Sequence, residues 1–384
     1  MYNIHSHYEN IFHGLKDIIA QRRVMYLYPY GATQPENIET ITDDLSEVQA
    51  RLWAERRQAD MSDGPLLIFY DQEPILGEFN YRLFDHIAKL RGPHVLVTTE
   101  KDSDAVRHIQ QRYGWHVVYY FHHIFAAHDW FRGTEFDKRL VPPADRTLTK
   151  KYITFNRLTS AGRVYRSLLV SNLARDGLLE QGYVSYNDIC PENNKDYISN
   201  LSLARDTGLI THELFNEACK NISQAPRPLR IDYQTHAQIP NHSFVLSAVA
   251  ESQESFCYVV TETCFWETKK HLTEKIFKPI VSKMPFILVG PAHNLEYLRS
   301  YGFKTFDRWW DESYDSIEDP IERLNAIQEI IKQICSLSLK DLEAMLVEMQ
   351  DVLEHNYHLF YSNKFLQDAW EELFNGIKSV VAPK

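Results

Sequence analysis

Short apolar runs alternate with helical spacing along the first third of the chain. Each run is long enough for a buried strand, and the apolar residues between runs recur at intervals of three and four, as on one helix face. The runs that predict strands are 24–28, 66–70, 95–97 and 116–121, and the segments that predict helices are 11–19, 79–90 and 105–112. Strands that alternate with helices predict a parallel sheet covered by helices on both faces.

A second series of the same kind follows a polar segment with two prolines, 141–150, which is typical of an interdomain linker. The predicted strands are 152–155, 256–260 and 286–289, with a further extended run at 303–306, and the predicted helices are 162–175, 324–334 and 342–353. We therefore expect an α/β protein of two Rossmann-like parallel-sheet domains, 1–145 and 146–350, that face a cleft. Helices in 351–384 are expected to close the fold by packing back toward the first domain.

Composition and charge narrow the functional classes. Hydrophobic residues make up 44% and charged residues 24% of the chain, as in globular proteins. The formal net charge is −11 and no run of Lys or Arg occurs, which argues against strong nonspecific binding to nucleic acid or to an anionic membrane. We see neither a signal-peptide pattern nor the roughly 20 apolar residues of a membrane span. These features predict a cytoplasmic protein.

The densest polar stretch, 261–275, directly follows an apolar strand and directly precedes a helix. In parallel α/β sheets, ligands bind beyond the carboxyl ends of the strands. Thr273 is predicted to cap the helix, where Glu274 suits the positive end of the helix dipole but Lys275 does not. A bound phosphate would explain the lysine. A capped surface helix with a solvated lysine would explain the same pattern without a ligand.

The run TETCFWETKKHLTEKIFKPIVSKMPFILVGP, 261–291, resembles the donor-binding signature of the α1,3-fucosyltransferases and their bacterial and phage relatives. The shared elements are an F-E-N-type segment at Glu262, the T-E-K helix start, and an apolar strand that ends in Gly-Pro. Upstream, KYITFNR and Arg163 resemble the strand, loop and arginine that open the donor domain of this family. Thr263 stands where the family has Asn, and Pro279 must kink or shorten the helix.

The resemblance covers roughly residues 150–310, and the chain is most similar to phage-encoded relatives that also carry FYDQEP and GFKTF segments. It implies a GT-B fold and metal-independent transfer from a nucleoside-diphosphate sugar, which is the co-substrate, with no cofactor. The implied donor-binding residues are Asn156, Arg157, Arg163, Glu262, His271, Thr273, Glu274 and Lys275. Arginine and lysine are suited to neutralise a diphosphate, and the glutamates to accept hydrogen bonds from sugar hydroxyls.

A hydroxyl acceptor also needs a base, and Asp71-Gln72-Glu73-Pro74 follows the predicted strand 66–70 at its carboxyl end. Asp71 or Glu73 could take the proton if burial raises its pKa, and capping of a helix that starts near 77 is the alternative. His122, His123 and His128 form a second candidate group. Without carboxylates at matching spacing, these histidines do not predict a metal site.

The leading hypothesis is an inverting glycosyltransferase with one of two kinds of acceptor. The phage resemblance favours hydroxymethylated bases in phage DNA, whereas the negative charge favours a glycan or small hydroxyl compound, since duplex binding requires Lys and Arg on phosphates. Two other classes stay open. One is a binding protein for nucleotide sugars or nucleic acid that has lost catalysis, and the other is a metal-dependent hydrolase that uses the histidines.

Overall fold

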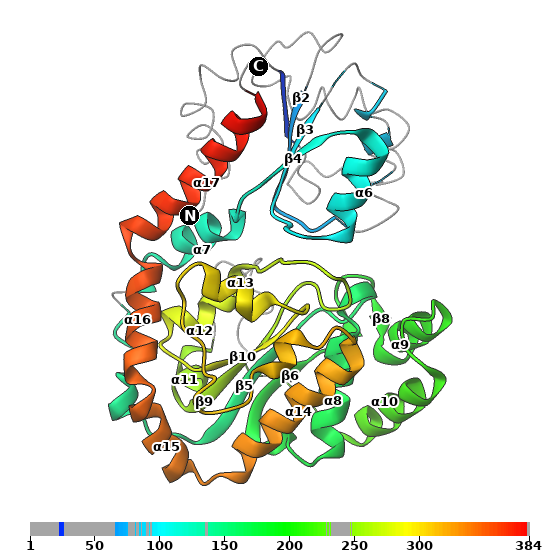
Figure 1. Cartoon of the computed structure of the whole chain (residues 1–384). Coiled ribbons are helices and arrows are strands. Elements are labelled where there is room, and N and C mark those ends of the chain that lie inside the picture. The colour runs from blue at the N-terminus through cyan, green and yellow to red at the C-terminus, as the bar shows by residue number, and fades with distance from the viewer. Residues whose placement is uncertain are drawn as a thin grey trace. The chain divides into compact units, whose positions relative to one another are not determined.

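Two compact units make up the computed structural model of the chain (Figure 1). Unit 1 consists of Met1–Ala126, Lys269–His271 and Asn363–Lys384, and unit 2 consists of Ala127–Thr268 and Leu272–Ser362. The structure describes residues 66–75, 94–134, 137–227 and 248–381, the backbone of 23–26, and positions 81, 84, 85, 87–89, 92, 229, 231 and 246. The predicted helix at 11–19 lies outside these described residues.

Unit 1 contains a parallel sheet whose described strands follow one another in chain order. The strands are β1 (Arg23–Tyr26), β2 (Leu66–Tyr70), β3 (Val95–Thr98) and β4 (His116–Tyr119), and the helices are α6 (Asp104–Tyr113), α7 (His122–Phe131), which continues into unit 2, and α17 (Asn363–Val381). All five residues of β2 are buried, as expected for a strand covered on both faces. The apolar runs thus predicted these four strands and α6 correctly.

Helix α17 packs on β4 and completes unit 1 from the C-terminal end of the chain. Its buried side chains recur every fourth position, at Phe365, Ala369, Leu373 and Ile377. Gly376 permits the close approach, because a Cβ atom there would lie 2.7 Å from Cγ1 of Val118. Of the predicted closing helices, only α17 belongs to unit 1.

Unit 2 contains a second parallel sheet, with strand order β10-β9-β5-β6. Its strands are β5 (Lys150–Asn156), β6 (Gly182–Tyr186), β9 (Ser255–Thr261) and β10 (Phe286–Val289), with a small hairpin of β7 (Ile189–Cys190) and β8 (Lys195–Asp196). Its helices are α8 (Tyr165–Arg175), α9 (Tyr197–Asp206), α10 (His212–Gln224), α11 (Val249–Gln253), α12 (Phe277–Val281), α13 (Asn294–Ser300), α14 (Pro320–Ser336), α15 (Leu339–Glu348) and α16 (Gln350–Phe360). Figure 1 shows α8 and α14 on one face of this sheet and α11 and α12 on the other. The expectation of an α/β protein with parallel sheets is confirmed.

The strand order of unit 2 creates a topological switch point. From β5 the chain moves outward to β6, and it then returns past β5 to form β9 on the other side. Ligands of open parallel sheets bind at the carboxyl ends of the two strands where the order reverses. The loops after β5 and β9 are therefore the place in unit 2 where the fold favours a binding site.

Two segments differ from the sequence-based expectation. Residues 141–149, predicted as a linker, are held within unit 2: the Val141 amide donates to Gln253 Oε1 (2.9 Å), and the buried Arg146 donates to the carbonyls of Ser282 and Lys283 (2.8 and 3.0 Å). The extended run 303–306 forms no strand, because the backbone N–H and C=O of Lys304 both bond to the side-chain amide of Asn356 (2.8 Å each). Among the described residues, no helix is long and apolar enough to cross a bilayer.

Candidate functional site

Arg166, a buried residue of α8, holds the two switch-point loops of unit 2 together. Its guanidinium donates to the carbonyl of Leu158 in the loop after β5 (3.0 Å) and to the carbonyls of Thr261 and Glu262 at the end of β9 (3.0 and 2.8 Å). The hydroxyl of Tyr165 donates to the same Glu262 carbonyl. Sequence analysis missed Arg166, because its position on the predicted helix 162–175 gave no indication of its partners.

Glu262 directly follows β9 and is fully buried, and its carboxylate accepts hydrogen bonds from its own loop. Oε1 accepts from the Thr273 amide (3.2 Å), and Oε2 accepts from the Thr273 hydroxyl (2.6 Å) and from the Thr263 amide (3.2 Å). Burial raises the pKa of this carboxyl. Since a carboxylate offers about four acceptor positions, most of them are occupied by the loop. In this structure Glu262 therefore fixes the loop, whereas the sequence predicted contact with the donor.

Lys275 lies on the turn that Thr273 caps. The Lys275 ammonium is 3.2 Å from the hydroxyls of both Thr263 and Thr273 and 3.0 Å from Oε1 of Glu274, and its side chain stays 30% exposed. The turn, Glu274–Ile276, is a 3-10 helix that continues into the five-residue α12, which contains Pro279. The helix is short, as expected from Pro279. A short helix has a weak dipole, so the positive charge at this turn comes mainly from Lys275.

Asn156 is the last residue of β5, and Arg157 and Arg163 lie in the segment that follows it. Asn156 is fully buried, and its Oδ1 has no hydrogen-bond partner among the described residues; the same is true of Oγ1 of Thr159. Arg157 is exposed. Arg163 forms an ion pair with Glu192, at 2.9 and 3.2 Å from its two carboxylate oxygens. Arg163 is therefore bound to a carboxylate of the protein itself.

A second buried arginine, Arg323 of α14, binds the loop after β9 through hydrogen bonds to its backbone. It donates to the carbonyl of Phe265 in that loop (2.7 Å) and to the carbonyl of Gly290 at the end of β10 (3.1 Å). Burial lowers the pKa of Arg323 to about 10. The Gly-Pro segment of the resemblance thus lies next to the candidate loop and is joined to it by Arg323, another residue that sequence analysis missed.

The structure brings only part of the predicted donor site together. Glu262, Thr273, Glu274 and Lys275 form one hydrogen-bonded group. The Thr261 hydroxyl joins the end of β9 to the end of β5 by donating to the Phe155 carbonyl (2.9 Å). The contacts of His271 place it in unit 1. There its ring centroid is 5.6 Å from that of His123.

Unit 1 has its own polar group at the carboxyl edge of its sheet. Asp71 directly follows β2 and is fully buried, and the hydroxyl of Tyr120, which directly follows β4, donates to Asp71 Oδ2. The same hydroxyl is 2.9 Å from Nδ1 of His122, which is itself 3.7 Å from Asp71 Oδ2. Because the one hydroxyl proton is donated to Asp71, Nδ1 of His122 must be the donor to the Tyr120 oxygen. We call these three residues the acid–base network.

Glu73, His123 and His128, the other residues considered for the base or for a metal, are not part of the acid–base network as described. Glu73 is half-buried, and the helix that Asp71 was expected to cap as an alternative role starts outside the described residues. The ring of His123 is 5.7 Å from that of His122. His128 belongs to unit 2, where it packs near Phe360 and burial lowers its pKa. In the described parts of both units, no three His, Cys, Asp or Glu side chains are grouped as metal ligands.

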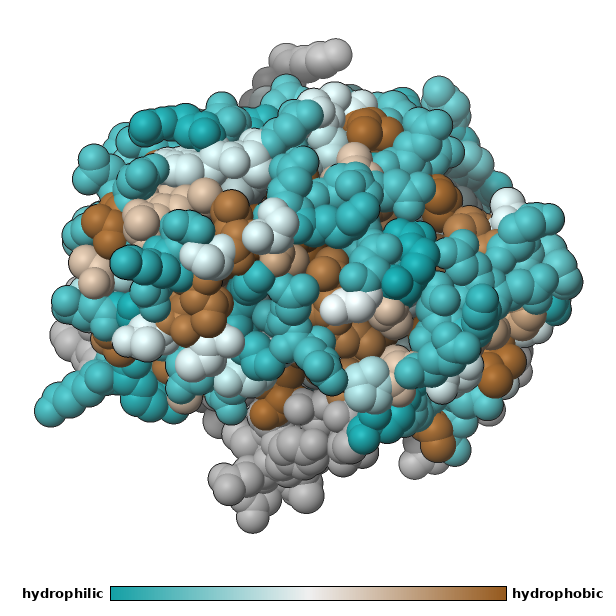
Figure 2. All heavy atoms as spheres, turned by 90° about the horizontal axis from the view of Figure 1, so that it is seen from below, coloured by the Kyte–Doolittle hydropathy of each residue, from teal (hydrophilic) through white to brown (hydrophobic). Residues whose placement is uncertain are grey.

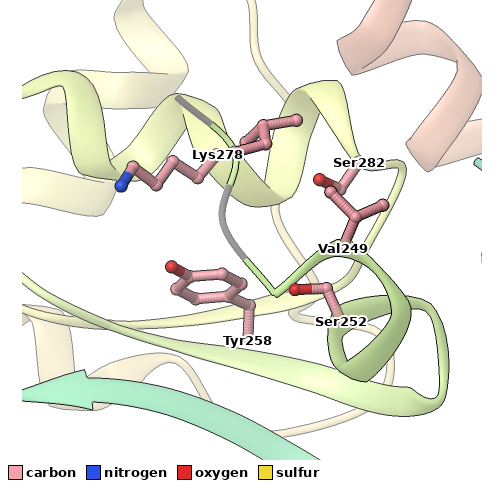
Figure 3. Close-up of a pocket in the computed structure, with 6 residues that line it drawn as sticks. Val249, Ser252, Tyr258, Lys278 and Ser282 are labelled. Carbon is pink, nitrogen blue, oxygen red and sulfur yellow. The ribbon is translucent and has the colours of Figure 1, made fainter. Parts of the chain in front are cut away.

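Two cavities of unit 2 lie away from these sheet edges. The pocket of Figure 3, between α11, β9 and α12, is lined by Tyr258, Lys278 and Ser282 among others and has a volume of about 10 Å³, which is room for one water. A larger cavity of about 120 Å³ lies between α8, α10 and α14. On the face shown in Figure 2, apolar residues are interspersed with polar ones, as is usual for a protein surface.

These observations define the class of protein. The chain is an α/β protein with two parallel-sheet units, and each unit carries a group of hydrogen-bonded polar side chains at the carboxyl edge of its sheet. Comparison with protein-family models, curated proteins and solved structures finds no significant match to the chain.

Proposed function

We propose that the protein is a glycosyltransferase of the GT-B type that moves a sugar from a nucleoside-diphosphate sugar to an acceptor hydroxyl. The observation that carries the proposal is the position of Lys275. Its partly exposed ammonium is fixed by Thr263, Thr273 and Glu274 at the switch point of unit 2. This edge is where parallel sheets bind nucleotides, and the residues are those that resemble the donor signature of the α1,3-fucosyltransferases.

In this proposal the diphosphate is neutralised by side chains. Arg157 is exposed. Lys275 must exchange one of its present partners for phosphate oxygens, as Arg163 must exchange Glu192. Negative charge grows on the diphosphate as the glycosidic bond breaks, so contacts to it lower the barrier as well as the dissociation constant. The buried amide oxygen of Asn156 is a further acceptor at the same edge.

The acceptor hydroxyl loses its proton as its oxygen bonds to the anomeric carbon. We assign this proton to the acid–base network, with Asp71 as the primary candidate and Glu73 as the other carboxylate of the same loop. The hydrogen bond from Tyr120 supports the ionised form of Asp71, since a donor to a carboxylate stabilises its charge. Direct displacement by the hydroxyl inverts the anomeric configuration.

For the acceptor, we propose a hydroxymethylated pyrimidine in phage DNA, on the strength of the likeness to phage-encoded relatives. The net charge of −11 favours the alternative of a glycan or small hydroxyl compound. Transfer assays with modified DNA and with free sugars as acceptors distinguish the two. A binding protein without catalysis is the second candidate function, because Glu262 and Arg163 are both engaged within the protein. Donor hydrolysis in the absence of acceptor would count against it.

Lys275→Ala is expected to weaken nucleoside-diphosphate binding by about 1–3 kcal/mol, the scale of a charged hydrogen bond. Calorimetric titration with UDP and GDP, after a thermal-shift screen of UDP-, GDP- and CMP-sugars, measures the loss. Lys332→Ala is the matched control, since Lys332 is a surface lysine of unit 2 whose ammonium pairs with Glu329. Equal affinity in the wild type and Lys275→Ala would exclude this site.

Sugar transfer in the presence of EDTA is expected to proceed at the same rate as in its absence, because Arg157, Arg163 and Lys275 neutralise the charge of the diphosphate. The measurement is turnover before and after chelation, with Mg²⁺ and Mn²⁺ added back. Loss of transfer that a divalent ion restores would show that a metal ion, and not side chains alone, neutralises the diphosphate.

A further inference from the structure

Glu100 is a buried carboxylate at the same edge of unit 1 as the acid–base network. It follows β3, and its Oε1 accepts from the Ile75 amide (2.6 Å) and from the Lys269 ammonium (2.7 Å). Its Oε2 accepts from the hydroxyl of Ser103, the N-cap of α6 (2.7 Å). Glu100 thus binds the last described residue of the loop that begins with Asp71.

Lys269 also binds the backbone of Ile75. It is 4% exposed, and its ammonium donates to the Ile75 carbonyl (3.3 Å) as well as to Glu100. Both backbone polar groups of Ile75 are therefore bound by the Glu100–Lys269 ion pair. The loop 71–75 is fixed at one end by Tyr120, which holds Asp71, and at the other by this pair.

The neighbours of Lys269 anchor it within unit 1. Lys270 pairs with Lys101 as an isolated antiparallel bridge, with N···O distances of 2.8 and 3.0 Å. His271 follows, next to His123. Along the chain, these residues lie between Glu262 and Thr273, which belong to unit 2. The segment that supplies Lys269 is therefore part of the polar stretch 261–275, which the sequence predicts to bind the donor.

A buried ion pair is poor evidence for stability, because desolvation offsets the attraction of its charges, and apolar residues often replace such pairs without loss. Glu100 and Lys269 bond to the backbone of one loop residue, which is a geometric function. We infer that Glu100 and Lys269 are a positioning pair that holds the loop 71–75 so that Asp71 can accept the proton of the acceptor. The inference rests on the proposed function for its catalytic part, and on geometry alone for the holding of the loop.

The test combines hydrogen exchange with kinetics on the full chain. Lys269→Met removes the ammonium and keeps the length of the side chain, and Lys270→Met is the control, because Lys270 is half-buried and its ion pair with Asp102 is partly exposed. We expect faster amide exchange in a peptide covering 71–75 for Lys269→Met alone. Turnover should fall about 10- to 100-fold, the cost of a displaced catalytic group, with nucleotide affinity changed less than about twofold. The pH dependence of turnover should shift in the same variant.

A second variant covers the case in which Lys269→Met fails to fold. Glu100→Gln/Lys269→Met removes both buried charges and keeps an acceptor for the Ile75 amide, so it should fold, exchange faster at 71–75 and turn over slowly. Wild-type exchange and turnover in the variant that folds would overturn the inference, and so would faster exchange with unchanged turnover. If the wild-type protein transfers no sugar from any donor, the proposed function fails instead, and exchange still decides whether the pair holds the loop.

Discussion

Asp71→Asn is expected to lower turnover by about 10²- to 10⁴-fold, the range for loss of a general base. The amide cannot take the proton of the acceptor, and it also turns one of the two carboxylate oxygens beside Tyr120 into a donor. Nucleotide affinity should stay close to that of the wild type, because Asp71 belongs to unit 1 and the predicted diphosphate ligands belong to unit 2. Single-turnover rates and calorimetric titration, measured on the same preparations, separate the two effects.

Two further variants locate the base. Glu73→Gln tests the other carboxylate of the loop, and Asp104→Asn, at an exposed position of α6, controls for the removal of a charge from unit 1. Near-normal turnover in both Asp71→Asn and Glu73→Gln would move the base to His122 or His123, and His122 is the one that Tyr120 contacts. In that case Tyr120→Phe should also slow the reaction, since the Tyr120 oxygen accepts from Nδ1 of His122 and so sets its tautomer.

Arg166→Met is expected to destabilise unit 2 by about 3 kcal/mol or more. The substitution removes the Arg166 donor from the carbonyls of Leu158 and Thr261, whereas the Glu262 carbonyl keeps the Tyr165 hydroxyl. An unsatisfied buried acceptor costs about 1–3 kcal/mol. The urea midpoint of unfolding, followed by tryptophan fluorescence, measures the loss. Arg175→Met is the control on the same helix: Arg175 is 40% exposed and pairs with Asp176 and Glu217, so its loss should cost at most about 1 kcal/mol. Equal midpoints for the two variants would contradict the structural role assigned to Arg166.

Continuous apolar runs made most of the fold predictable from the sequence. Strands buried on both faces consist of such runs, and β2, β3, β5, β9 and β10 all carry one. The edge strand β6 was missed, because only Gly182, Val184 and Tyr186 are buried and the residues between them are not. The predicted helix 342–353 is divided between α15 and α16 at Met349, although its apolar spacing is unbroken.

The candidate site was predictable where its residues are close in sequence, and only there. Thr273, Glu274 and Lys275 form one turn and were found together, whereas Tyr120 is 49 positions from Asp71 and Lys269 is 169 positions from Glu100. A signal for Glu100 did exist, since it stands shortly after the predicted strand 95–97, and parallel strands end at the same edge. This signal identifies neighbouring residues only when the order of the strands in the sheet is known. Tyr120 lies within the predicted strand 116–121, whereas β4 ends at Tyr119. Nearness in sequence also grouped His271 with Thr273, although its contacts place it in unit 1.

The close approach of α17 to β4 at Gly376 has a consequence for how the protein is made. Along the chain, the strands of unit 1 precede most of unit 2, and the helix that covers β4 follows unit 2. All of unit 2 is synthesised before that helix, and domains usually fold as their residues emerge. The sheet of unit 1 therefore keeps the apolar surface under Leu373 and Ile377 uncovered until α17 has been synthesised. Unit 2 has all its residues before unit 1 does.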